Sequence, residues 1–175
     1  MENVVEPQEQ LPVLPNSSVE EQSLISADKF LVLSIATMGL YTFWWSYKTW
    51  RFFQQKDQLD ISPALRAIFG IFFLIPLYKR ILDYAREKGY QEHYSPVLLF
   101  VFGLAFELLG FLPNPFFLLS NISILFVLPV FKALLHAMQH ATEYSAVSQS
   151  GYSTRQKVLL GIGGLIWIVC MTSIE

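Results

Sequence analysis

The chain has 175 residues, of which 53% are hydrophobic and only 15% are charged, whereas soluble domains carry about 25% charged residues. This deficit of charge excludes an ordinary water-soluble domain and indicates a surface that faces lipid. A net charge of -2 leaves no basic excess to neutralise phosphates, which excludes nucleic-acid binding. The single cysteine, Cys170, excludes an intrachain disulfide and a thiolate metal cluster.

Residues 1–27 are rich in Glu, Gln, Pro, Ser and Asn and contain no Lys or Arg. Such a segment buries too little apolar surface to offset the entropy of ordering, so we predict a disordered acidic tail. Its acidic residues also argue against a cleavable secretory signal, which needs a basic start. Residues 28–175 are predicted to form a helical membrane domain.

Four apolar runs of 17 or 18 residues follow, and Glu107 is the only charged side chain inside them. A helix of this length rises about 26 Å, enough to cross the hydrocarbon core of a bilayer. Each run is therefore predicted to cross as one helix. The four runs are Phe30–Tyr47 (30–47), Pro96–Leu112 (96–112), Pro115–Phe131 (115–131) and Val158–Ile174 (158–174).

The first run contains Thr37, Gly39 and Tyr41 near its middle. Thr37 and Gly39 permit a bend in this helix, where the Thr37 hydroxyl can satisfy a freed carbonyl. The run ends in aromatic rings that prefer the headgroup level, followed by basic residues, which predicts a cytoplasmic interface. The predicted interface anchors are Trp44, Trp45, Tyr47 and Trp50.

The segment 63–78 is apolar apart from Arg66 and is short for a crossing, so a re-entrant or interfacial helix is predicted. A helix over Leu77–Lys88 has one apolar face, and Gly89 is suited to end it. We expect that helix to lie along the membrane surface.

Three helix starts are marked by a side-chain acceptor followed by proline, a residue whose missing N–H costs nothing at this position. The three pairs are Ser62-Pro63, Ser95-Pro96 and Asn114-Pro115. In addition, the segment 72–79 reads like the segment 125–132, and an amphipathic stretch follows each. This likeness indicates either a duplicated unit or a coincidence of membrane composition.

The distribution of Lys and Arg predicts the orientation. If the segment 63–78 does not cross, eleven of the twelve basic residues share one side of the membrane; if it crosses, the division is eight against four. We predict an all-α membrane bundle of four transmembrane helices plus one re-entrant or interfacial helix, with both termini outside. Five crossings with the N-terminus inside is the alternative, and the internal likeness favours it.

Glu107 is the candidate functional residue within the membrane, where an ionisable group suggests a proton or cation path. A hairpin that turns at residues 113–114 places Ser120 and Asn121 at its depth, where both can hydrogen-bond the carboxyl group. Glycines three and four residues away on the same face allow another helix to approach. The structural alternative is that Glu107 lies about 7 Å inside the span end and reaches the interface.

His136, His140 and Glu143 share one face of a predicted helix and are a weak candidate set of zinc ligands. A hydrolase signature needs Glu directly after the first His, where this chain has Ala137, and Lys132 on the same stripe repels a cation. The polar side of a surface helix is the alternative interpretation, and we predict no metal or other cofactor.

Gly161, Gly163 and Gly164 lack the spacing of a phosphate-binding loop and indicate close helix packing. The chain also has no Gly-x-Ser-x-Gly or Walker motif, so we predict that it is not an enzyme.

The motif Thr37-x-Gly39-x-Tyr41-x-x-Trp44 and the segments 63–69 and 72–78 resemble a family of small bacterial multi-pass membrane proteins of unknown function. The resemblance covers roughly residues 28–170 and implies a location in the bacterial cytoplasmic membrane. It implies no reaction. We expect a structural or interaction component of that membrane, with the lipid bilayer, other membrane proteins or a second copy as partners. The alternative is a small ion, proton or solute transporter that uses Glu107.

Overall fold

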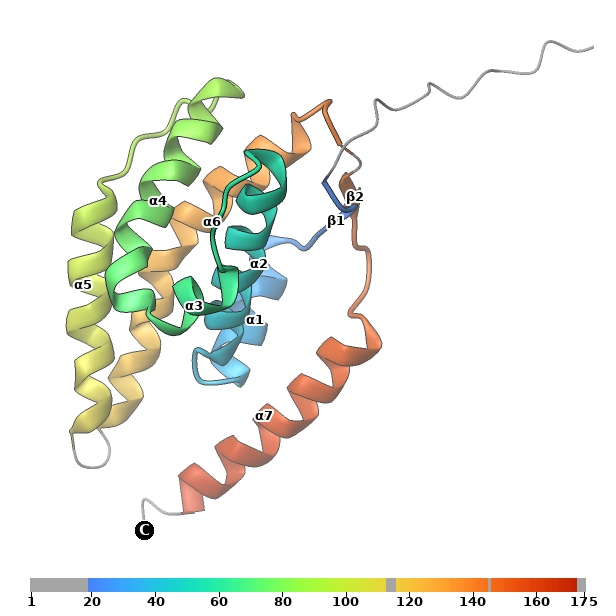
Figure 1. Ribbon diagram of the computed structural model, residues 1–175. Helices are drawn as coiled ribbons and strands as arrows, with labels where there is room; N and C mark the ends of the chain where they lie inside the picture. The colour runs from blue at the N-terminus through green and yellow to red at the C-terminus, as the bar shows by residue number, and fades with distance from the viewer. Residues whose placement is uncertain (1–18, 113–115, 145, 173–175) are drawn as a thin grey trace, which may run out of the picture.

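A computed structural model describes residues 19–112, 116–144 and 146–172 (Figure 1). The fold is all-α, and two short strands pair beside the helices. Helix α6 is central, since it packs against α1, α4 and α5. The elements are β1 Gln22–Leu24, α1 Ala27–Ala36, α2 Leu40–Lys56, α3 Pro63–Ile68, α4 Gly70–Glu87, α5 Pro96–Leu108, the 3-10 helices η1 Leu109–Phe111 and η2 Phe116–Ile122, α6 Ser123–Gln139, β2 Ala146–Ser148 and α7 Thr154–Thr172.

The first apolar run folds back on itself, so the prediction of one continuous crossing over 30–47 is wrong. The Phe30 and Trp45 rings lie 5.7 Å apart, whereas fifteen residues of unbroken helix would separate them by about 22 Å. The chain reverses at Gly39, whose φ of 86° is a left-handed conformation that glycine adopts without a steric penalty. Helices α1 and α2 therefore form a hairpin (Figure 1).

Thr37 stabilises this reversal with its side chain. Its hydroxyl donates to the Leu33 carbonyl at 2.8 Å, which is the kind of bond that the sequence predicts. The same oxygen accepts a hydrogen bond from the Tyr41 backbone N–H at 3.0 Å. One side chain thus ties the end of α1 to the first turn of α2, where both backbones lack helical partners.

The start signals predicted from serine and proline are confirmed at two helices. The Ser62 hydroxyl accepts a hydrogen bond from Leu65 N at the start of α3, and the Ser95 hydroxyl accepts one from Leu98 N at the start of α5. Asn114-Pro115 lies outside the described residues. Helix α4 ends at Glu87 and is followed by Gly89 with a φ of 85°, as predicted.

Helix α4 does not lie with its apolar face along a membrane surface, so that prediction is wrong. Leu77, Ile81, Tyr84 and Ala85 form the predicted face, and all four are buried. Because α4 packs against α6, this face belongs to the protein core. The preceding segment 63–78 is divided by a break at Phe69 between α3 and α4.

The internal likeness extends to the three-dimensional positions. Pro76 lies inside α4 and Pro129 lies inside α6, and the two helices pack against each other. Five positions after each proline follow the same pattern of burial. The residues buried at these five positions are Leu77, Tyr78, Ile81, Tyr84 and Ala85 in α4, and Val130, Phe131, Leu134, Ala137 and Met138 in α6, while Leu82 and Ala133 are buried without a buried equivalent.

The start of the described chain is ordered, so the prediction of a disordered tail is wrong for residues 19–27. Strand β1 pairs in parallel with β2, placing Gln22 beside Ala146. The Ser26 hydroxyl then accepts a hydrogen bond from Lys29 N and caps α1. Residues 1–18 lie outside the described residues.

Candidate functional site

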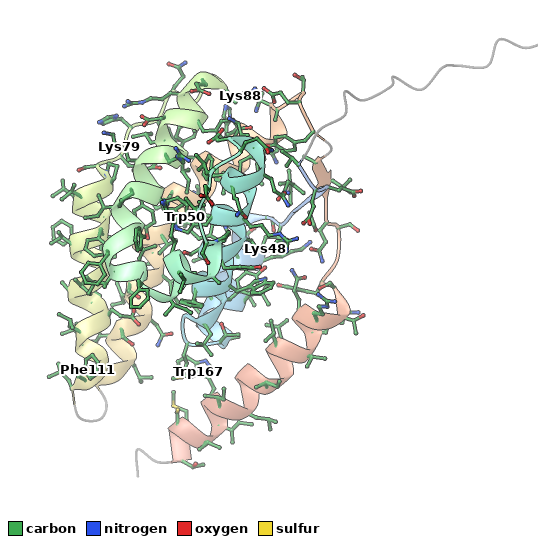
Figure 2. All side chains as sticks on the ribbon, in the orientation of Figure 1. Lys48, Trp50, Lys79, Lys88, Phe111 and Trp167 are labelled. Carbon is green, nitrogen blue, oxygen red and sulfur yellow. The ribbon has the colours of Figure 1, made fainter. Side chains whose placement is uncertain are left out.

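The two ends of the molecule differ in chemistry. Figure 2 shows Phe111 and Trp167 toward one end and Lys79 and Lys88 toward the other. The first end, called the apolar end below, carries exposed apolar side chains such as Leu40, at the turn between α1 and α2, and Phe111, which are 67% and 87% exposed. Exposed apolar surface on this scale marks a contact with lipid or with another protein.

The opposite end, called the polar end, is held together by ion pairs and by buried tyrosines. Arg80 pairs with Asp57 at 3.4 Å, and Lys88 pairs with Glu143. The Lys88 ammonium group holds the pKa of the Glu143 carboxyl below its ordinary value. The Tyr84 and Tyr144 hydroxyls lie 3.0 Å apart, and burial raises the pKa of Tyr84 to about 12.

Within the described residues, two helices are long and apolar enough to cross a membrane, by length and composition. They are Leu118–Gln139, which includes α6, and Thr154–Thr172, which is α7. Pro96–Phe111 is a shorter apolar helix.

Helix α7 contacts the rest of the fold near its start and again around Gly163. Near its start, the Gln156 side-chain oxygen accepts a hydrogen bond from the Gln149 amide at 2.9 Å. The Gln156 side-chain nitrogen lies 3.5 Å from the Tyr41 hydroxyl. Farther along, Gly163 lies so close to α1 that an added Cβ would be 2.2 Å from the Ala36 carbonyl oxygen. The Trp167 indole N–H donates to the Ile35 carbonyl at 3.0 Å.

The glycine packing predicted for α7 thus depends on one residue of the three. A Cβ added at Gly161 or Gly164 would meet no atom within 4 Å. Only Gly163 permits the close approach of α7 to α1, because only there does the partner backbone occupy the space of a side chain.

Glu107 is exposed on α5, and its carboxylate accepts a hydrogen bond from the Ser123 hydroxyl at 2.7 Å. The predicted partners lie elsewhere. Asn121 donates to the Leu118 carbonyl, and Ser120 packs beside Gly110, where an added Cβ would be 3.4 Å from the Ser120 Cβ. The structure therefore brings Glu107 together with Ser123, one helical turn beyond Ser120.

His136 and His140 stack with ring centroids 4.1 Å apart at the end of α6. Glu143 turns away from them to pair with Lys88, so the three candidate ligands do not meet around one point. No group of three or more His, Cys, Asp or Glu side chains within the described parts of the chain is arranged to hold a metal ion.

Two of the four predicted interface anchors face outward. Trp44 is 49% exposed and lies 5.3 Å from the partly buried Tyr47 ring. Trp45 and Trp50 are buried, so the prediction that they are anchors is wrong. Trp50 lies instead under the Arg66 guanidinium, at 4.4 Å.

Ser123 and Gln156 are the polar residues that sequence reasoning missed. Gln156 gives a local signal, since it stands three residues after Ser153 at the start of an apolar run, and the Ser153 N–H donates to its side chain at 2.8 Å. Ser123 gives no such signal, because its role depends on how α5 and α6 align.

Comparisons of this chain with protein-family models, with curated proteins and with solved structures found no match. The resemblance based on the motif in α1 and α2 therefore stays a prediction.

Proposed function

We propose that the protein is a multi-pass integral component of the bacterial cytoplasmic membrane with a structural role, in which it assembles with other membrane components. The observation that carries this proposal is the outward surface of α7. Its side chains there are apolar and exposed, as at Leu165, Ile168 and Val169, which are 65%, 62% and 64% exposed. Such a surface needs lipid or another helix to cover it.

The apolar end supports placement in the bilayer. Helix α7 is 19 residues long and therefore rises about 28 Å, close to the thickness of a hydrocarbon core. The α5–α6 hairpin also exposes apolar side chains, including Val101, Leu108 and Leu125. Helix α1 has only 10 residues, too few to cross a hydrocarbon core, so we place the hairpin of α1 and α2 as a re-entrant element.

The fold supports an orientation that differs from two outside termini. Lys29 donates to the carbonyls of Gln149 and Ser150 at 2.7 Å, which ties the start of α1 to the segment that leads into α7. Helix α7 begins beside the middle of the bundle and runs toward the apolar end (Figure 1). Because basic residues favour the cytoplasm, we place the start of the described chain inside and the end of α7 outside.

Cysteine labelling tests this orientation in intact cells. With Cys170→Ser as background, Thr172→Cys is expected to react with an impermeant thiol reagent added outside, whereas Gln54→Cys on α2 is expected to be protected until the cells are opened. Labelling of Gln54→Cys in intact cells overturns the orientation. Release of the wild-type protein into the supernatant by alkaline washing of membranes overturns the integral placement.

A photo-crosslinking residue at Ile168 tests the assembly role. The expected result in native membranes is a discrete protein adduct, with twice the mass of the chain if the partner is a second copy. The same residue at Leu33, which is fully buried, is the matched control and is expected to crosslink only within the chain. Lipid adducts alone from Ile168, Leu165 and Val169 contradict assembly through α7.

The alternative function is transport of an ion, a proton or a small solute. It is favoured by the Glu107 carboxylate, which lies within an apolar helix and accepts a hydrogen bond from Ser123. Reconstituted vesicles separate the two proposals, because transport predicts a flux that Glu107→Gln abolishes. A protein that yields adducts at Ile168 and carries no such flux supports assembly.

A further inference from the structure

Helix α7 and the main bundle enclose a groove of about 900 Å³ (the α7 groove). Its opposite wall is built from β1, from one face of α2 and from α6. The two contacts of α7 described above, at Gln156 and Gly163, hold its walls in place. The volume is within the range of about 300–1,000 Å³ that is usual for small-molecule sites.

The lining of the α7 groove changes from polar to apolar along α7. Arg155 lies in the first turn of α7, and the polar lining also includes Lys48 of α2, Gln22 and Gln149. Ile162 and Ile166 line the groove farther along α7, opposite residues from the first turns of α2. A ligand that matches this lining has a polar head and an apolar tail.

The charged residues of the lining indicate the charge of the polar head group that the groove can bind. Lys48 and Arg155 form no ion pair with any described residue. The residues that line the α7 groove, all of them in the described parts of the chain, include no Asp or Glu. Two basic side chains without an acidic neighbour favour an anionic group. Figure 2 shows Lys48 on the side of α2 nearer to the strand pair.

The length of the α7 groove matches one leaflet of a bilayer. From Arg155 to Ile166 the helix rises about 16 Å, and half of a hydrocarbon core is about 15 Å thick. Under the proposed orientation, the basic side chains lie at the cytoplasmic side. The polar end of the groove is then level with the phosphates of the inner leaflet.

We propose that the α7 groove binds one anionic phospholipid of the cytoplasmic leaflet. Its phosphate pairs with Lys48 and Arg155, and an acyl chain lies between α7 and α2. This inference rests on the proposed placement in the membrane and adds a ligand to it. The lipid fills the space between the two contacts of α7 and so holds α7 against the bundle.

Native mass spectrometry tests the role of Lys48 and Arg155. Phosphatidylglycerol is added to the full chain in detergent, and the protein is then released from the detergent in the instrument. One bound lipid per chain is expected, with weaker binding of phosphatidylcholine that has the same acyl chains. Lys48→Gln with Arg155→Gln is expected to weaken binding of phosphatidylglycerol about 25-fold, since each basic side chain near an anionic headgroup contributes about fivefold. Lys132→Gln with Lys157→Gln removes the same charge outside the groove and is expected to leave binding unchanged.

Ile162→Trp tests the apolar end, because a bulky ring at this half-exposed site fills the groove and keeps both cations. Loss of the bound lipid is expected, whereas Ile168→Trp, on the outward side of α7, is expected to retain it. The inference is overturned if the two double variants, Lys48→Gln with Arg155→Gln and Lys132→Gln with Lys157→Gln, weaken lipid binding equally. It is also overturned if phosphatidylglycerol and phosphatidylcholine bind equally well, or if the protein is a dimer without bound lipid. The proposed function fails separately, if alkaline washing releases the protein from membranes.

Discussion

Helices α6 and α7 are the two described helices that are long and apolar enough to cross a membrane, and the bundle covers them differently. In its most apolar window of 18 residues, the span Leu118–Gln139 has a mean hydropathy of 2.1, and 33% of that window is buried. In α7 the corresponding window has a mean hydropathy of 1.3, and only 6% of it is buried. The more apolar helix is therefore the one that other helices surround. Hydropathy measures the preference of a helix for an apolar environment and does not distinguish protein from lipid.

The partners of each helix explain this difference. In α6, Val130, Ala133 and Ala137 are fully buried against neighbouring helices. In α7, Gly163 and Gln156 are the described residues that are buried, and they coincide with two of its contacts to the bundle. Helix α6 thus stabilises the fold through its buried side chains, while most of α7 is left as exposed apolar surface.

Truncation of an aromatic ring in α6 is expected to have the largest effect. Phe131 stacks on Phe30 at 4.2 Å and packs beside Trp45. Phe131→Ala is expected to lower the free energy of unfolding in detergent by about 3–5 kcal/mol, because it leaves a cavity in the core. Ile168→Ala in α7 is the control and is expected to change it by less than about 0.5 kcal/mol. Equal losses for the two variants would remove the distinction between the helices.

A side chain at the contact of α7 is expected to have the next largest effect. Gly163→Leu places carbon atoms where the Ala36 carbonyl lies, so α7 must move away, at a cost of about 1–3 kcal/mol. Spin labels on α1 and α7 are expected to report a longer and broader distance distribution. Gly164→Leu, beside it in open space, is expected to leave the distance as in the wild type. An unchanged distance in Gly163→Leu contradicts the close contact.

Alkaline pH is expected to loosen the polar end around Tyr84. The pKa of Tyr84 is raised from 10 to about 12 in the fold, so the folded state keeps a proton that the unfolded state loses. The stability from this proton is therefore fully present below pH 10 and is lost as pH rises toward 12. Thermal unfolding in detergent measures this loss, and Tyr84→Phe with Tyr144→Phe is expected to reduce the slope. An unchanged slope in that variant contradicts the assignment.

Loss of the cap at the start of α7 is expected to have the smallest effect. The Ser153 hydroxyl accepts a hydrogen bond from Gln156 N at 3.3 Å. Ser153→Ala is expected to cost about 1 kcal/mol and to increase hydrogen exchange in the first turn of α7. Ser150→Ala changes an exposed serine outside the helix and serves as the control. Equal exchange in the two variants shows that Ser153 does not cap α7.

The candidate at Glu107 shows why sequence reasoning placed its partner wrongly. A symmetric turn at residues 113–114 sets Glu107 opposite Ser120. In the structure, Gly103 lies beside Phe126 and Gly110 lies beside Ser120, so the position opposite Glu107 falls at 122–123. A helical side chain also points toward its own N-terminus, which turns Glu107 toward Ser123. The register between two helices depends on the turn that joins them, and the local pattern does not encode it.

The sequence alone was sufficient for the features that nearest neighbours control. The serine caps of α3 and α5, the glycine after α4 and the residues of the apolar face of α4 are all properties of a few adjacent residues, and all were predicted. Only the tertiary structure decided that the first apolar run reverses at Thr37–Gly39, because the reversal brings Phe30 beside Trp45 and Phe131. The same holds for α7, whose contact at Gly163 requires a particular carbonyl of α1. Contacts between residues far apart in the chain decide which apolar surface is buried in protein. Hydropathy does not predict this, because it treats the protein interior and the lipid as the same apolar environment.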